Sequence, residues 1–243
     1  MADNNHVDIL VFSAHPDDTE ITCGGTILRS VADGKRVGLI DLTRGEMGTR
    51  GTPELRLEEA REAAKILGAS FREILDFGDG KLRHGEDEEL ILIDKIREYR
   101  PSIIVAPWPD ERHPDHARTG RLVTEAWFYA GLKKRETSHA PFRPQSVVYY
   151  MQNYVLHPTF VVDITPWAGK KMEAIRAHRS QVYNPETNEP QTIIAKREFL
   201  DLIEGRARHF GALIGSELGE GFLTKQPPRV DDITSAYRGR EVS

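Results

Sequence analysis

The chain has 243 residues, of which 39% are hydrophobic and 29% charged, a composition typical of a folded globular protein rather than a disordered one. With 33 basic and 38 acidic side chains the formal charge is −5 and no long basic run occurs, so nucleic acid is not an expected partner. The single cysteine, Cys23, excludes an internal disulfide and a cysteine-rich zinc cluster, which indicates a reducing, cytoplasmic location. Because no export signal and no apolar stretch of about 18 residues is visible, we expect no membrane partner.

Short apolar runs alternate with helix-length amphipathic segments along most of the chain. The runs that predict strands are residues 7–12, 37–42, 71–75, 102–106, 147–151 and 160–164. The segments that predict helices are residues 24–32, 53–67, 88–99, 116–129 and 192–213. Pro53 and Gly68 mark the start and the end of the second helix. The alternation predicts an α/β, Rossmann-like three-layer fold with a mainly parallel sheet, in a single domain of residues 1–243.

The first predicted strand runs directly into a polar cluster, Ala14-His15-Pro16-Asp17-Asp18-Thr19-Glu20. Burying an imidazole and three carboxylates together is costly unless a cation compensates their charge. Imidazole nitrogens and carboxylate oxygens are ligands for zinc and related ions, so a divalent metal is the simplest compensation. On this segment alone, a polar loop that caps a helix explains the residues equally well.

A second cluster, Glu111-Arg112-His113-Pro114-Asp115-His116, follows the fourth predicted strand. In a doubly wound sheet of order 3-2-1-4-5, strands one and four are neighbours where the winding reverses, and ligands bind beyond their carboxyl ends. Both clusters should therefore face one crevice, which favours a functional metal site at the carboxyl ends of the strands.

The loop after the second predicted strand, residues 43–52, contains three glycines but no phosphate-binding spacing. Its residues Arg44 and Arg50, and Arg56 in the following helix, are candidates for binding acidic or hydroxyl groups of a substrate, although a solvated loop explains the first two equally well. For His178 a structural role is favoured, and Cys23 is expected to be a packed thiol.

The motifs Ala-His-Pro-Asp-Asp-Thr-Glu and His-Pro-Asp-His, taken together, resemble those of the PIG-L/LmbE-like family of zinc-dependent N-acetylglucosaminide deacetylases. The likeness extends through residues 43–56 to the C-terminal Gly219-Glu220-Gly221-Phe222. The chain is similar above all to the branch of this family that deacetylates N-acetylglucosaminyl-L-malate in bacillithiol biosynthesis.

The resemblance implies a role for each matching residue. His15, Asp18 and His116 match the family's zinc ligands, and Asp17 matches the general base that later returns its proton to the amine. His113 matches the histidine that stabilises the oxyanion, and Asp115 the carboxylate that orients that histidine and keeps it protonated. Arg56 matches an arginine of the family's substrate pocket. The matches of Arg44, Arg50 and Arg112 are less close. We expect one of these four arginines to bind substrate carboxylates. We place Glu20 beside a ligand or a sugar hydroxyl, which it would orient.

The reaction expected from the resemblance is hydrolysis of the N-acetyl amide of an N-acetylglucosamine glycoside, the malate glycoside first and an inositol or chitooligosaccharide conjugate as alternatives. The implied cofactor is Zn²⁺, with Fe²⁺ as another divalent candidate, and the partners are a small sugar conjugate and further copies of the chain, often six in relatives. Two other classes stay open: a non-haem iron oxygenase, since two histidines and a carboxylate also bind ferrous iron, and a non-catalytic sugar-binding protein.

Overall fold

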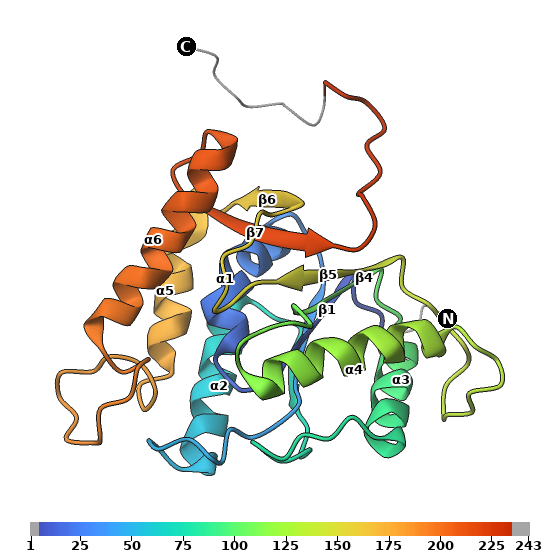
Figure 1. The fold of residues 1–243 in the computed structure, drawn as a ribbon, viewed down its shortest axis with the longest axis horizontal. Helices are drawn as coiled ribbons and strands as arrows, with labels where there is room; N and C mark the ends of the chain where they lie inside the picture. Colours follow the sequence, from blue (N-terminus) through green and yellow to red (C-terminus); the bar gives the residue numbers. More distant parts are fainter. Residues whose placement is uncertain (1–4, 235–243) are drawn as a thin grey trace.

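The computed structural model describes residues 5–234, so the outermost residues of the predicted domain, 1–4 and 235–243, lie outside it (Figure 1). Within this range, seven strands form one sheet: β1 (Ile9–Ser13), β2 (Val37–Asp41), β3 (Phe71–Ile74), β4 (Ile103–Pro107), β5 (Ser146–Tyr150), β6 (Phe160–Asp163) and β7 (Gly219–Thr224). Their order is β3-β2-β1-β4-β5-β7-β6. The first five strands run parallel, and β7 pairs antiparallel with both β5 and β6. The mainly parallel sheet of the predicted α/β fold is confirmed.

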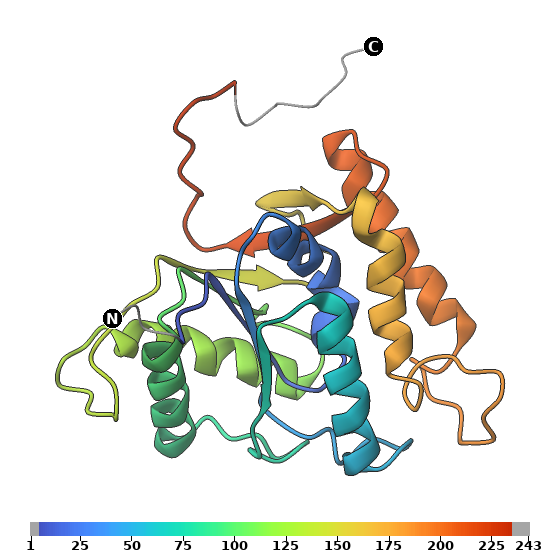
Figure 2. The same cartoon turned by 180° about the vertical axis from the view of Figure 1, so that it is seen from behind.

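The described helices are α1 (Asp18–Ala32), α2 (Pro53–Leu67), α3 (Glu86–Tyr99), α4 (Pro114–Ala130), the 3-10 turn η1 (Thr165–Trp167), α5 (Ala168–Ala177) and α6 (Arg197–Ile214). Figures 1 and 2 show them on both sides of the sheet, which gives three layers. None of the helices in residues 5–234 is both long and apolar enough to cross a membrane.

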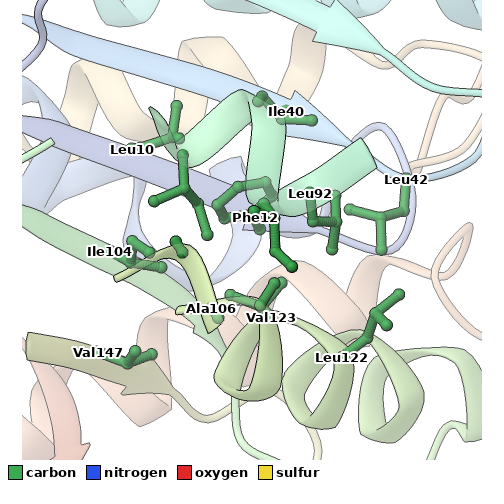
Figure 3. Packing of buried hydrophobic residues seen from close by; sticks show 14 of the residues in the cluster. Leu10, Phe12, Ile40, Leu42, Leu92, Ile104, Ala106, Leu122, Val123 and Val147 are labelled. Atoms are coloured by element: carbon green, nitrogen blue, oxygen red, sulfur yellow. The ribbon is translucent and has the colours of Figure 1, made fainter. Parts of the chain in front are cut away.

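Alternate residues of the central strands supply two cores, because neighbouring side chains of a strand point to opposite faces. In β1, Leu10 and Phe12 pack with α3 and α4, whereas Val11 packs with α1, α2 and α5 on the other face. Figure 3 shows the first of these cores, with Phe12 among side chains of neighbouring strands and of the covering helices. These strands are buried on both faces, as expected for parallel strands covered by helices.

Local sequence signals explain why some helix bounds were predicted well. The Thr52 side chain accepts a hydrogen bond from the Leu55 amide, Pro53 occupies the first helical turn, and Gly68 ends α2 with a φ of 72°. At that φ a glycine avoids the strain that a Cβ atom would cause.

Three expectations need correction. The helix α1 begins at Asp18 rather than at residue 24, so the first polar cluster runs into its first turn. The strand β7 was not anticipated, because its antiparallel pairing with β5 and β6 is non-local and it contains two glycines. Helix α6 begins at Arg197, five residues later than expected, because residues 192–196 lie in the preceding loop.

Candidate active site

The two polar clusters meet at the carboxyl edge of the sheet. β1 and β4 are adjacent parallel strands, so the segments that follow them leave the sheet side by side. The first segment leads into α1 at Asp18, and the second into α4 at Pro114. The predicted crevice between neighbouring strands is therefore present, and both clusters face it.

His15, Asp18 and His116 are mutually in contact. One carboxylate oxygen of Asp18 lies 3.5 Å from His15 Nδ1, and the other lies 3.2 Å from His116 Nε2. The backbone N–H of His15 also donates to Asp18 at 2.9 Å, which fixes the carboxylate between the two rings. His113 joins them, since nitrogens of His15, His113 and His116 lie within 4.8 Å of one another.

This donor set suits a divalent metal ion. The three side chains are buried, and within the described residues His116 Nδ1 has no hydrogen-bond partner. Burial opposes ionisation of Asp18, yet His116 and His15 hold the pKa of this carboxyl well below its usual value. An ionised carboxylate between two imidazoles offers the nitrogen and oxygen ligands that zinc and related ions take in proteins.

Asp79, which the sequence analysis did not single out, supports His15 from behind. Its carboxylate lies 3.0 Å from His15 Nε2 and accepts the backbone N–H of Met47 at 2.8 Å. The Nδ1 atom of His15 is thereby left to face Asp18. A carboxylate on the far nitrogen of a metal-binding histidine fixes its tautomer and its orientation. The signal in the sequence was an aspartate between two glycines, Gly78-Asp79-Gly80, shortly after a strand at the same edge of the sheet.

Asp17 lies next to the ligand set and is held by Arg56. The Arg56 guanidinium lies 3.5 Å from the Asp17 carboxylate and donates to the carbonyls of Pro16 and Gly45. Burial raises the pKa of Asp17, and Arg56 counteracts part of this effect. The carboxylate is thus a stronger proton acceptor than an exposed aspartate.

The expected link between Asp115 and the His113 ring takes another form. His113 Nδ1 accepts the backbone N–H of Asp115 at 3.2 Å, whereas the Asp115 carboxylate accepts from Gly80 N at 2.7 Å and from Arg118 at 3.1 Å. Burial, and then the neighbouring His116 and His15, lower the pKa of His113. The structure therefore orients the His113 ring through the backbone, and the expected bond from the Asp115 carboxylate to this ring is not present.

Two of the four candidate arginines reach the crevice. Arg56 and Arg112 line it, and the exposed Arg112 donates to Asn153. Arg44 forms an exposed ion pair with Asp76, so its expected substrate contact is not supported. Arg50 is buried against Glu189 and the loop before α6, so it too lies outside the lining of the crevice.

Glu20 also lies elsewhere than expected. It is fully buried and pairs with Arg72 at 2.6 Å, and Arg72 in turn pairs with Asp41. A substrate hydroxyl cannot reach a carboxylate enclosed in this way, so the expected substrate contact is wrong. The buried His178 lies 3.4 Å from Glu20 and belongs to the same interior network, as a structural role predicts. Burial raises the pKa of the Cys23 thiol, which agrees with a packed side chain.

The ligand set lies in a pocket of about 340 Å³ with two unlike walls. One wall is polar and comes from the segments after β4 and β5: Arg112, Gln152 and Asn153. The other is apolar and comes from the Gly-rich loop, the loop before α6 and α6 itself: Met47, Ile193, Ile194, Phe199, Leu202 and Ile203. Arg206, which was not anticipated either, lines the pocket and donates to the carbonyls of Gln152 and Ile21.

Fold and site together define a class: an α/β protein whose doubly wound sheet carries a candidate metal-ligand set at its carboxyl edge. Residues 10–127 match the family model described as PIG-L, GlcNAc-PI de-N-acetylase. A diacetylchitobiose deacetylase of Thermococcus kodakarensis is 37% identical over 73% of this chain and 71% of its own length. The chain belongs to the PIG-L family.

Two further comparisons support this assignment. A Bacillus anthracis protein named probable N-acetyl-alpha-D-glucosaminyl L-malate deacetylase 2 is 29% identical over 81% of this chain and 88% of its own length. The crystal structure of a conserved protein of Thermus thermophilus superposes with a TM-score of 0.85 at 36% identity, covering 93% of this chain and 98% of that one.

Proposed function

We propose that this protein is a metal-dependent hydrolase that removes the N-acetyl group of an N-acetylglucosamine conjugate. The observation that supports this best is the contact of Asp18 with both His15 and His116, with the buried Asp17 directly beside them. The relatives at 37% and 29% identity are both named as deacetylases of N-acetylglucosamine compounds, which supports the same class of reaction.

We assign His15, Asp18 and His116 as the ligands of the metal, with Zn²⁺ as the first candidate. When bound, such an ion lowers the pKa of a coordinated water and polarises an amide carbonyl. His113 adds a hydrogen-bond donor to this arrangement. Because its Nδ1 accepts the Asp115 amide, the neutral ring carries its proton on Nε2, where it can donate to the developing oxyanion.

Asp17 is assigned both proton transfers. Its carboxylate accepts a proton from the attacking water and returns it to the nitrogen of the breaking C–N bond, so that acetate and a free amine leave. Arg56 positions this carboxylate through its contacts with the carbonyls of Pro16 and Gly45. An iron oxygenase or a non-catalytic sugar-binding protein would not need a buried base at this position.

The L-malate glycoside of bacillithiol biosynthesis is the substrate expected from the resemblance, and the Bacillus anthracis relative supports it by name. The pocket supports it less, because Arg44 and Arg50 lie outside its lining while Arg112 remains at the polar wall. The Thermococcus kodakarensis relative, which has the higher identity of the two, is named a diacetylchitobiose deacetylase. We therefore propose the reaction at the level of an N-acetylglucosamine glycoside, in a cytoplasmic homo-oligomer as expected from the sequence.

The test is amine release by the zinc-loaded protein from N-acetylglucosaminyl malate, N-acetylglucosaminyl inositol, diacetylchitobiose and free N-acetylglucosamine. Release from any of them supports the proposed reaction, and Asp17→Asn should then bind zinc as tightly as the unchanged protein while losing at least about a hundredfold in kcat. Silence on all four substrates with zinc bound would contradict the proposal. Near-normal turnover of Asp17→Asn would contradict the role of Asp17.

A further inference from the structure

Helix α6 contributes one regular face to the apolar wall of the pocket. Phe199, Leu202, Ile203 and Arg206 are spaced i, i+3, i+4 and i+7, so they lie along one side of the helix, and all four line the pocket. Ile203 is anchored in a buried cluster with Ile21, Ile175 and Val182. The part of the wall that α6 contributes is therefore held in place by packing, whereas Met47 and Ile193 join it from loops.

The outer half of this wall is left uncovered by the chain itself. Leu202 is 64% exposed, and Ile193 and Met47, which line the same pocket, are 68% and 66% exposed. These three side chains lie on the apolar wall of the same pocket that holds His15 and His116 at its base. Because apolar surface is stabilised when it is removed from water, a ligand that covers these side chains gains affinity.

The three arginines that line the pocket already donate hydrogen bonds to other groups of the chain. The guanidinium of Arg206 donates to the carbonyls of Gln152 and Ile21, and that of Arg56 to the carbonyls of Pro16 and Gly45. Arg112 also lines the pocket and donates to Asn153. A carboxylate placed near Leu202 would have to compete with these carbonyls for a bidentate bond to a guanidinium.

Resting on the proposed function, we infer that Leu202, Ile193 and Met47 form a specificity site for an uncharged hydrocarbon aglycone, an alkyl or aryl group linked to N-acetylglucosamine. The reacting amide must lie at the ligand set at the base of the pocket. The strongly exposed side chains lie at its mouth, so they meet the part of the substrate farthest from the amide. The polar lining residues Arg112, Gln152 and Asn153 can bind the sugar hydroxyls. A pocket of about 340 Å³ is at the small end of ligand sites, so the group is short.

Binding separates this inference from the proposed reaction, since it needs no turnover. We would measure by calorimetry, with zinc-loaded protein, the Kd values of the methyl, n-hexyl and L-malate glycosides of N-acetylglucosamine in both anomers, and of diacetylchitobiose. Asp17→Asn replaces the unchanged protein if hydrolysis interferes. Each buried methylene strengthens binding about fourfold, so the hexyl glycoside should bind at least about tenfold more tightly than the methyl glycoside.

Substitutions at the mouth then locate the contact. Leu202→Ser and Ile193→Ser should each reduce the ratio of methyl to hexyl Kd at least about threefold. The matched control Ile91→Ser, which changes a 42% exposed side chain of α3, should leave the ratio unchanged.

Four results overturn the inference: equal Kd values for the methyl and hexyl glycosides, tighter binding of the malate glycoside, tighter binding of diacetylchitobiose, or a hexyl preference that survives both substitutions. If none of the glycosides releases an amine but the hexyl preference and its loss are observed, the proposed reaction fails while the apolar site stands.

Discussion

Asp17 is held in a backbone conformation that residues with a side chain rarely adopt, with φ 141° and ψ −26°. Strain of this kind costs roughly 1–3 kcal/mol and persists where the surroundings fix the chain. Here Arg56 binds the carbonyl before Asp17, and the Asp17 carbonyl accepts the first α1 hydrogen bond, from Ile21. The conformation places one carboxylate next to the ligands while the adjoining Asp18 contacts them directly.

Replacing Asp17 with glycine should therefore reveal the strain. Glycine tolerates positive φ and alanine does not, and glycine is also preferred to alanine at an N-cap, the position that Asp17 occupies in α1. We therefore expect Asp17→Gly to be more stable than Asp17→Ala by about 1–2 kcal/mol. Urea unfolding of both variants with the metal chelated measures the difference. Both lack the carboxylate, so the comparison isolates the backbone. Equal stability, or a more stable alanine variant, would show that φ is relaxed in solution.

Asp79 provides a second test at this scale, directed at metal binding. We expect Asp79→Asn to weaken zinc binding about 10- to 100-fold, because the amide is a poorer acceptor for His15 Nε2–H and no longer fixes the ring. Competition with a chromophoric chelator measures the Kd. Asp76→Asn, three residues earlier and 61% exposed, is the matched control and should bind zinc like the unchanged protein. If both variants bind alike, Asp79 does not position His15.

At the scale of elements, site residues that are adjacent in the sequence could be predicted, whereas those that only the tertiary fold brings to the site could not. Both metal-ligand clusters are continuous in sequence at strand ends, so the order of β1 and β4 was enough to bring them together. Asp79 and Arg206 are isolated residues on other elements, and only the folded chain brings them to the pocket. Glu20 was misplaced for the same reason: its partner Arg72 is 52 residues away, and without it a carboxylate in the motif looks free for substrate.

Helix α1 depends on a residue of β7 that the sequence analysis quoted without assigning a role. The helix is interrupted at Cys23 (φ −131°, ψ 16°), and the Glu220 carboxylate accepts the amides of Gly25 and Thr26 that begin its second half. The Lys171 ammonium pairs with the same carboxylate at 2.6 Å, and both side chains are buried. Glu220, a residue of β7, thus caps the second half of α1.

Breaking this contact should destabilise the fold strongly. We expect Glu220→Gln to lower the free energy of unfolding by about 3–5 kcal/mol, because it leaves the Lys171 charge buried without a partner. The double variant with Lys171→Met should recover part of that loss, since no unpaired charge remains. Denaturant unfolding of the four proteins of the cycle measures the coupling. Additive losses would mean that the buried pair has no net interaction.

At the scale of the whole molecule, we expect the free energy of metal binding to contribute to the stability of the fold, and we expect pH to regulate that contribution through His15. Burial disfavours its charged form, but hydrogen bonds to Asp115, Asp18 and Asp79 raise the pKa of His15 well above its usual value. Protonated His15 therefore stabilises the metal-free fold fully below about pH 6.5, and this stabilisation is lost as the pH rises through the raised pKa.

Zinc must displace that proton, so its binding should strengthen as the pH rises from about 6.5 to 8.5. Most carboxylates around the site have lowered pKa values, about 2 for Glu20 and Asp115, and the pKa of His113 is lowered as well, so these groups keep their charge in this window. Asp17 is the exception among the carboxylates, because burial raises its pKa. One displaced proton gives about a tenfold gain in affinity per pH unit, which corresponds to about 3–6 °C in the Tm difference between zinc-loaded and chelated protein. Thermal unfolding at several pH values measures that difference. A zinc-dependent Tm gain that stays constant across the window would mean that His15 is already neutral without the metal, and that its three carboxylate neighbours do not hold a proton on the ring.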